Sequence, residues 1–234
     1  MRVVAFGAAG PTGRLLTQLL LDAGHETVAV TRHPEQFDLR HDRLRVEAAD
    51  ATDLGAVTKA VDGADAVVSV LGTPFSRDPI TLYSASATAL TRAMADTGVR
   101  RLVVTSSSAV TGWVDPRWNW VERNLTHRLL GILGRTLYED MRRMEAVVGA
   151  TDLDWTIMRP LGLANLDPPT SYALAEEHIP GRQTARRDLA AAIVDQLHRD
   201  DHHRKAVAIA TTNKSMSIAQ TIWREGIKPK LPKI

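Results

Sequence analysis

The 234-residue chain contains no cysteine. That absence excludes disulfide bonds, catalysis by a thiolate, and zinc sites built on cysteine ligands. It also gives no positive sign of an oxidising, extracellular environment. We expect no metal site from the histidines either, because His202 and His203 are adjacent and lie in a segment (200–205) that is typical of an exposed turn.

Long hydrophobic runs and a strong net charge are also missing. No apolar run approaches the roughly 20 residues that a membrane-spanning helix needs, and no signal peptide is readable after Arg2. The net charge is only +2, and the basic residues are scattered. We therefore expect a cytoplasmic monomer or homodimer that binds a small-molecule substrate, and neither nucleic acid nor a membrane.

Apolar runs of strand length alternate with segments in which apolar residues recur at helical spacing. This alternation predicts an α/β fold, a doubly wound, Rossmann-like parallel sheet with right-handed crossovers. We expect a single domain (1–234) with a small C-terminal substrate lobe formed mostly by residues 161–186. Strands are expected at 2–6, 27–31, 44–48, 66–70, 101–105, 154–158 and 206–210, and helices at 15–24, 53–61, 80–96, 185–197 and 217–225, with two further helices before 149 that part near 131–134.

The most informative segment runs from Val3 to Gly13 and reads VVAFGAAGPTG. A short apolar strand ends in glycines at positions 7, 10 and 13, and a helical pattern follows at once. Such a turn lets main-chain N–H groups approach a pyrophosphate, while the positive end of the helix faces the anion. The spacing is GxxGxxG rather than the usual GxGxxG of dinucleotide-binding proteins. We interpret it as a nucleotide cofactor site rather than as an ordinary strand-to-helix turn.

The residues after the second predicted strand bear on which nucleotide binds. In a doubly wound sheet the ligand lies at the carboxyl ends of the strands. Here the strand is followed by Arg32 and His33, not by an acidic residue. An acidic side chain would bind the ribose 2′-hydroxyl, whereas a guanidinium pairs with a 2′-phosphate. We therefore predict NADPH in preference to NADH, the alternative being that Arg32 is merely solvated.

The other strand ends supply further candidates. Asp50, followed by Ala51, can accept a hydrogen bond from the adenine amino group or can cap the helix that begins near 53. Thr105, Ser106 and Ser107 place hydroxyls at a strand end, where they can bind a substrate carbonyl or simply terminate the strand. The predicted cofactor-binding residues are Gly7, Ala9, Gly10, Pro11, Thr12, Gly13, Arg32, His33, Asp50, Ala51, Val70, Leu71, Gly72, Thr105, Ser106, Pro160, Leu161 and Gly162.

Together these motifs resemble the atypical branch of the short-chain dehydrogenase/reductase superfamily, with NmrA-like and biliverdin/flavin reductase members most similar. The resemblance covers residues 3 to about 197. It implies a pyrophosphate on the glycine-rich turn, a 2′-phosphate on Arg32 and His33, adenine at Asp50 and Ala51, and ribose beside Leu71 and Gly72. It rests on GAAGPTG at Gly7, VTR at Val30, AADATD at Ala48, VLGTP at Val70, TSSSAVTG at Thr105, and the segment from Met144-Glu145 to Arg159-Pro160.

Two departures from the family pattern bear on catalysis. Typical members carry Tyr-x3-Lys, in which the phenol donates a proton to the substrate carbonyl. This chain has Tyr138-x3-Arg142, but counting back from the later family motif puts the tyrosine and lysine positions on Leu137 and Met141. Tyr138 is then either an acid catalyst or a packing residue in the pocket wall. Leu161 stands where the biliverdin/flavin reductases have a histidine, which argues against a biliverdin-like substrate.

Three functional hypotheses follow. The first is an NADPH-dependent oxidoreductase that reduces a small planar conjugated acceptor (a flavin, quinone or enone), with Ser106, Ser107 and Tyr138 as candidate catalytic residues. The second is a non-catalytic NADP(H)-binding regulator of the NmrA-like kind. The third is an epimerase or dehydratase that recycles its cofactor internally. The predicted substrate-binding residues, which can equally serve local packing or a subunit contact, are Phe75, Trp113 and Trp118.

Overall fold

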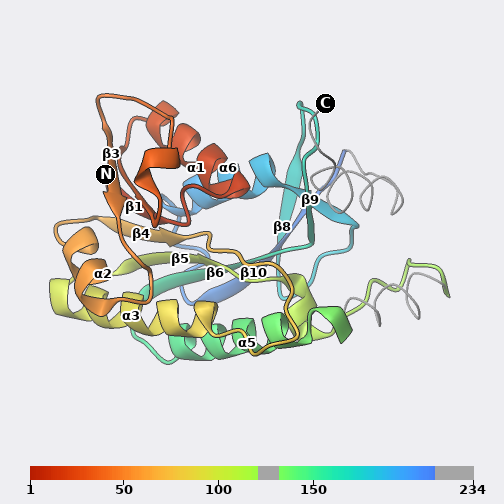
Figure 1. The fold of residues 1–234 in the computed structure, drawn as a ribbon. Helices are drawn as coiled ribbons and strands as arrows, with labels where there is room; N and C mark the ends of the chain where they lie inside the picture. Colours follow the sequence, from red (N-terminus) through yellow and green to blue (C-terminus); the bar gives the residue numbers. More distant parts are fainter. Residues whose placement is uncertain (121–131, 214–234) are drawn as a thin grey trace, which may run out of the picture.

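An eight-stranded, mostly parallel sheet organises the protein, as the computed structural model describes it for residues 1–120 and 132–213. The strands are β1 (Arg2–Phe6), β2 (Glu26–Thr31), β3 (Leu44–Ala48), β4 (Ala66–Ser69), β5 (Arg101–Thr105), β6 (Asp154–Pro160), β7 (Gly162–Ala164), β8 (Tyr172–Glu176), β9 (Gln183–Ala185) and β10 (Lys205–Thr211). Their order in the sheet is β3-β2-β1-β4-β5-β6-β10-β8, with β8 antiparallel to β10 (Figure 1). The short strands β7 and β9 pair separately, in parallel.

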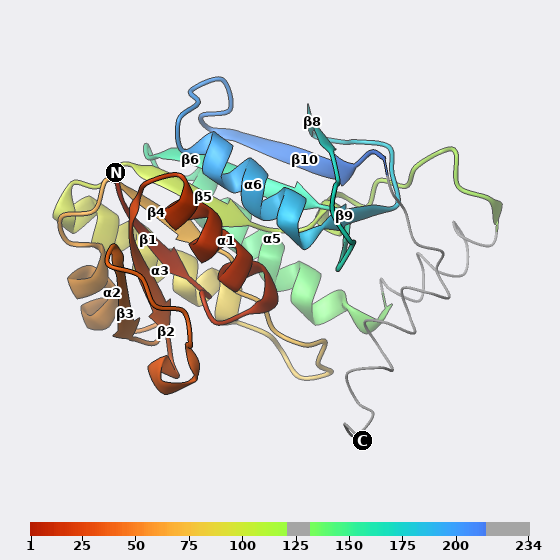
Figure 2. The same cartoon turned by 90° about the horizontal axis from the view of Figure 1, so that it is seen from above.

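Helices cover both faces of the sheet. Helices α1 (Pro11–Asp22) and α6 (Arg186–Gln196) lie on one face, and α2 (Leu54–Val61), α3 (Leu82–Thr97) and α5 (Arg135–Gly149) lie on the other (Figure 1). Figure 2 shows α1 and α6 from above. No helix in the described ranges is long and apolar enough to cross a membrane. The described residues also form the short 3-10 helices η1 (Pro34–Gln36) and η2 (Ser108–Thr111).

The central strands contain continuous apolar runs because each strand contributes side chains to two hydrophobic cores. In β1, Val4 and Phe6 pack toward α2, α3 and α5, whereas Val3 and Ala5 pack toward α1 and α6. Successive side chains of a strand point to opposite faces, so this division follows directly from the backbone. All four side chains are completely buried. A parallel sheet covered on both faces therefore requires the continuous apolar run that the sequence shows.

The predicted fold class is confirmed, and most predicted strands and helices agree with the structure within two residues. Sequence reasoning missed β7, β8 and β9, all within the segment 161–186. Strands β7 and β9 have only three residues each, too few to display a hydrophobic period, and the five residues of β8 are at most partly buried and form no continuous run of large apolar side chains. Strand β8 also makes the sheet mixed rather than wholly parallel. The predicted helix at 217–225 lies outside the described residues, and the predicted break at 131–134 lies partly outside them.

A buried carboxylate ties α5 to the beginning of α3. Asp140 has no exposed surface, and its carboxylate accepts hydrogen bonds from the backbone N–H of Tyr83 at 2.8 Å and from the Ser84 hydroxyl at 2.5 Å. Arg143 donates to the same carboxylate at 3.1 Å. The first N–H groups of a helix have no partner within it, so Asp140 caps α3 from a neighbouring helix. This cap also fixes the position of Tyr83, a residue of the candidate site described below.

Replacing Asp140 with alanine should lower the free energy of unfolding by about 2–4 kcal/mol, because the buried N–H of Tyr83 then loses its charged acceptor. Urea unfolding at pH 7, followed by circular dichroism, measures the change. The control is Glu139→Ala on the same helix, since Glu139 makes no hydrogen bond or ion pair within the described residues; it should stay within about 0.5 kcal/mol of the parent. Equal losses for the two variants would contradict this role.

Candidate functional site

The turn between β1 and α1 lies at the carboxyl end of the central strand. Gly7 has a φ of +81°, in the left-handed region that favours glycine. A Cβ atom at Gly7 would lie 2.8 Å from the carbonyl oxygen of Val70, just beyond the end of β4. Helix α1 follows with Gly10 as its N-cap and Pro11 in its first turn, and no side chain caps it. The first N–H groups of α1 are therefore open to a bound anion.

Two further residues hold this turn in place. A Cβ atom at Gly13 would lie 2.1 Å from the carbonyl oxygen of Gly7, so α1 can approach the turn only because position 13 is glycine. Arg14 braces the turn from the other side, because its Nε donates to the Ala9 carbonyl at 3.2 Å and its Nη2 to the Gln36 carbonyl at 2.7 Å. The turn is thus fixed between α1 and the segment that follows β2.

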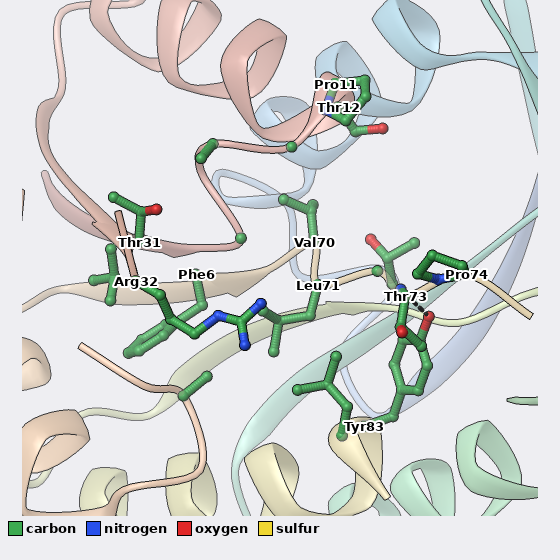
Figure 3. Close-up of a pocket in the computed structure, with 18 of the residues that line it drawn as sticks. Phe6, Pro11, Thr12, Thr31, Arg32, Val70, Leu71, Thr73, Pro74 and Tyr83 are labelled. Carbon is green, nitrogen blue, oxygen red and sulfur yellow. Dashed lines mark hydrogen bonds between the residues drawn. The ribbon is translucent and has the colours of Figure 1, made fainter. Parts of the chain in front are cut away.

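The carboxyl ends of β1, β2, β4 and β5 border a cavity of about 760 Å³, here called the large cavity (Figure 3). It lies where β1 is flanked by β2 and β4, the point at which the strand order reverses and at which doubly wound sheets bind ligands. Its size is within the range of cavities that hold cofactors. The predicted cofactor-binding residues that line it are Gly7, Ala9, Gly10, Pro11, Thr12, Arg32, His33, Asp50, Ala51, Val70, Leu71, Gly72, Thr105 and Ser106.

Basic side chains lie at the end of the large cavity formed by β2. Figure 3 shows the Arg32 side chain extending along the cavity toward Leu71. Arg32 is exposed, and within the described part of the chain no hydrogen bond or ion pair engages its guanidinium. The neighbouring His33 lies beside Glu35, with 3.4 Å between Nδ1 and the carboxylate. The guanidinium is therefore available to an anionic ligand at this end.

Asp50 was predicted either to bind the adenine amino group or to cap the helix that begins near residue 53. Asp50 Oδ1 accepts from the backbone N–H of Thr52 at 2.9 Å and from its hydroxyl at 2.7 Å. These hydrogen bonds, with a smaller contribution from the charge of Arg32, hold the pKa of Asp50 below its usual range. Helix α2 is capped instead by Asp53, whose carboxylate accepts from the Ala56 N–H at 3.1 Å. Asp50 is thus not the helix cap, and it lines the large cavity as an ionised group.

At the β5 end of the large cavity, two hydroxyls are buried without a partner among the described residues. Thr105 Oγ1 and Ser106 Oγ make no hydrogen bond within the described residues, although both atoms are buried. Leaving a buried hydroxyl unpaired costs about 1–3 kcal/mol. Both residues line the large cavity, so a ligand with polar atoms at this end, such as the carboxamide of a nicotinamide ring, would lie next to them. The residues present therefore fit a nicotinamide nucleotide.

Tyr83 also lines the large cavity and contributes a phenol to it. It is not among the predicted cofactor-binding residues. Its hydroxyl accepts a hydrogen bond from the Thr73 N–H at 3.3 Å, the dashed line in Figure 3. Burial raises the pKa of Tyr83, so the phenol is neutral at physiological pH. Tyr83 comes from the first turn of α3, and only the fold brings that turn to the strand ends.

A second cavity of about 270 Å³, here called the small cavity, begins at the next residue of the same strand end, Ser107. The Ser107 hydroxyl also accepts from the Ala109 N–H at 3.2 Å and so caps η2. Phe75 lines neither cavity; it is 50% exposed, and its ring meets Tyr138 edge-on with 6.3 Å between centroids. The other predicted residues that line the small cavity are Trp113, Trp118, Tyr138, Leu161 and Gly162.

Helix α5 contributes to both cavities. Met141 lines the large cavity, whereas Tyr138 and Arg142 line the small one. Leu137 and Met141, the positions that counting assigns to the family's tyrosine and lysine, are both buried. Burial raises the pKa of Tyr138, so its hydroxyl stays protonated at neutral pH. Arg142 is no substitute for the lysine, because its Nε donates to the Val110 carbonyl at 2.8 Å and thereby braces η2.

A family model for NAD(P)H-binding proteins matches residues 7–200. The chain belongs to this NAD(P)H-binding family. An uncharacterized protein of Mycobacterium tuberculosis (strain H37Rv) is 41% identical over 108 residues, which are 46% of this chain but 12% of that protein. The chain thus spans a small part of the length of its mycobacterial relatives. An uncharacterized chloroplastic protein of Arabidopsis thaliana is 28% identical over 218 residues, covering 89% of this chain and 76% of that protein.

Solved structures share the fold of this chain. A short-chain dehydrogenase/reductase of Veillonella parvula in complex with NADP is 22% identical, with a TM-score of 0.73 and coverage of 91% of this chain and 95% of that one. A protein described as a putative epimerase of Bacteroides thetaiotaomicron is 22% identical, with a TM-score of 0.74 and coverage of 92% and 99%. At this level of identity the likeness extends to the fold alone.

Four predicted cofactor residues of this NAD(P)H-binding protein lie outside the large cavity. Gly13 packs α1 against the turn, and Pro160 lines neither cavity because β6 extends to it. Leu161 and Gly162 line the small cavity, so they do not face the place predicted for the carboxamide. The large cavity is also lined by residues that were not predicted: Phe6, Val30, Thr31, Ala49, Thr73, Pro74, Leu82, Tyr83, Met141, Leu163, Arg186 and Leu189. Of these, Met141 could have been found from the sequence, because counting back from the later family motif puts the family's lysine position there.

Gly13→Ala should weaken NADPH binding by about tenfold or more, because the new Cβ atom must push the turn away from its position over the strand ends. Calorimetric titration measures the dissociation constant, and far-UV circular dichroism verifies that the variant is folded. The matched control is Gly55→Ala on α2, where the nearest atom to a new Cβ, Asp53 Oδ1, is 3.4 Å away. An unchanged dissociation constant in a folded Gly13→Ala protein would refute this role of the close contact.

Proposed function

We propose that the chain is an NADPH-dependent oxidoreductase that reduces a small planar conjugated acceptor, of flavin, quinone or enone type. One observation carries the proposal: Thr105 and Ser106 line the large cavity, and the small cavity begins at the next residue, Ser107. A cofactor site and a substrate site that adjoin at one strand end are what hydride transfer requires.

A bound nicotinamide nucleotide supplies the hydride. The chain's own residues bind and orient it. The N–H groups at the start of α1 hold the diphosphate. The hydroxyls of Thr105 and Ser106 hydrogen-bond the nicotinamide end or the acceptor, and so set the distance between them. Positioning of this kind supplies most of the rate enhancement when little proton transfer is needed.

The groups that face the acceptor favour a conjugated substrate. Counting back from the later family motif puts the family's proton donor and its lysine on Leu137 and Met141, and neither side chain carries a proton to give. Tyr138 lines the small cavity with a raised pKa, which makes it a hydrogen-bond donor rather than an activated acid. A flavin, quinone or enone delocalises the charge it receives, so that water can complete the protonation.

The NADPH preference rests on Arg32. Its guanidinium lies along the large cavity with no partner in the described ranges, and a planar guanidinium matches a phosphate with two hydrogen bonds. Asp50, which follows β3, is ionised. The positive charge of Arg32 offsets the repulsion between this carboxylate and a 2′-phosphate.

Replacing Arg32 with alanine should raise the dissociation constant for NADPH by about 10–100-fold, the value of a charge-assisted contact, and that for NADH by less than about threefold. Parallel titrations with the two nucleotides measure both constants. The control is Arg40→Ala, a nearby arginine that donates to the backbone carbonyl of Phe37 and lines neither cavity. Equal effects of Arg32→Ala on the two nucleotides would refute the assignment.

The oxidoreductase proposal is tested by NADPH oxidation with lumiflavin, 1,4-naphthoquinone and benzylideneacetone. Turnover with at least one acceptor is expected. Ser106→Ala should lower kcat by about tenfold or more while changing the NADPH dissociation constant little, because the hydroxyl acts where the reacting groups meet. Tight NADPH binding without turnover on any acceptor would overturn the oxidoreductase proposal.

A specific observation supports the alternative of a non-catalytic NADP(H) sensor: two apolar side chains, Leu137 and Met141, stand where the family has its catalytic pair. A sensor binds NADP+ and NADPH with similar affinity and exchanges no hydride. Stereospecific loss of deuterium from labelled NADPH during turnover excludes the sensor. An epimerase or dehydratase, the third hypothesis, is marked by nucleotide that remains bound through purification.

A further inference from the structure

Positive charge gathers around the small cavity. Arg135 and Arg142 both line it, from positions seven residues apart on α5, which corresponds to about two helical turns. Arg135 makes no hydrogen bond or ion pair with any residue in the ranges 1–120 and 132–213. Arg142 donates its Nε to the neutral carbonyl of Val110 at 2.8 Å, and it forms no ion pair with the residues that the structure describes. Arg182, just before β9, adds a third guanidinium to the lining.

The carboxylate of Asp115, which also lines the small cavity, does not cancel this charge. It is 2% exposed and is paired with Arg117, with 2.8 Å between Nη2 and Oδ2 and 3.0 Å between Nε and Oδ1. Asp115 also accepts from the Gly181 N–H at 3.0 Å. The Asp115–Arg117 pair is therefore neutral overall, and it holds the loop after η2 against the segment between β8 and β9.

Aromatic rings give the small cavity flat walls. The Trp113 ring stacks on His178, with 5.1 Å between centroids and 6° between planes. Trp118 is fixed by its indole N–H, which donates to the Gly181 carbonyl at 3.2 Å. Rings held in this way suit a planar ligand. The volume of about 270 Å³ lies near the lower limit for ligand cavities, so it suits a body of one or two rings.

We propose that the acceptor is a small planar conjugated carboxylate, whose carboxylate binds Arg135 and Arg142 in the small cavity while its conjugated part faces Ser106. This inference rests on the proposed oxidoreductase function and names its substrate class. Reduction of an enone of this kind forms one C–H bond at the β-carbon with the hydride of NADPH. A second C–H bond forms at the α-carbon with a proton from water, and the products are NADP+ and the saturated ketone.

Binding is tested without turnover, on the complex with NADP+. The probes are 2-naphthoate and its neutral analogue 2-naphthamide, titrated by tryptophan fluorescence, since Trp113 and Trp118 line the cavity. We expect 2-naphthoate to bind about tenfold more tightly or better, and this preference to shrink as salt is raised. Arg135→Gln and Arg142→Gln should each reduce the preference by about threefold or more.

The matched control is Arg92→Gln, an exposed arginine on α3 that lines neither cavity and loses the same charge. It should leave the preference unchanged. Equal affinities for the two probes, no binding of either, or an unchanged preference in both cavity variants would overturn the inference.

Turnover then separates this inference from the proposed function. The pair of acceptors is 4-carboxybenzylideneacetone and its methyl ester, which share the reacting enone but differ in charge. We expect the acid to have a KM about tenfold lower than the ester, and Arg135→Gln to remove the difference. If both acceptors are reduced with equal KM, the inference fails and the oxidoreductase stands. If 2-naphthoate is preferred but no acceptor oxidises NADPH, the oxidoreductase proposal fails and the anion site stands.

Discussion

The contact between α1 and the end of β1 is the constraint on which the site depends. A side chain at Gly13 would lie 2.1 Å from the Gly7 carbonyl, and one at Gly7 would lie 2.8 Å from the Val70 carbonyl. Three backbone segments therefore meet at distances that exclude a Cβ atom. Because of that approach, the uncapped beginning of α1 stands over the carboxyl edge of the sheet, where the helix dipole favours a diphosphate.

The end of β5 divides the site into two parts. Three consecutive hydroxyl residues leave this strand, and each meets a different environment. Thr105 and Ser106 line the large cavity, and their buried hydroxyls have no partner among the described residues, whereas the Ser107 hydroxyl caps η2 and Ser107 lines the small cavity. The same division recurs on α5, where Met141 faces the large cavity and Tyr138 the small one. One strand end and one helix thus contribute to both cavities.

The sequence predicts those features that local spacing determines. The glycines after β1, the basic residue after β2 and the hydroxyls after β5 are each readable because a parallel sheet collects its strand ends at one edge. Contacts between distant segments leave no such pattern. Nothing in the sequence distinguishes the buried Asp140 from Glu139 beside it, and the three-residue strands β7 and β9 are too short to show a period. Leu161 and Gly162 turn toward the small cavity because β6 runs two residues longer than its apolar pattern.

The chemistry open to this site follows from which protons its residues can give. Tyr138 lines the small cavity with a pKa raised by burial, and Asp115 is ionised and held by Arg117. The described lining of the small cavity contains no histidine and no other carboxylate. Hydrogen bonds and positive charge are therefore what the protein offers there, rather than an acid that works near pH 7. Such an environment stabilises negative charge that spreads over a conjugated acceptor, and it would do little for an isolated ketone, whose alkoxide needs a proton at once.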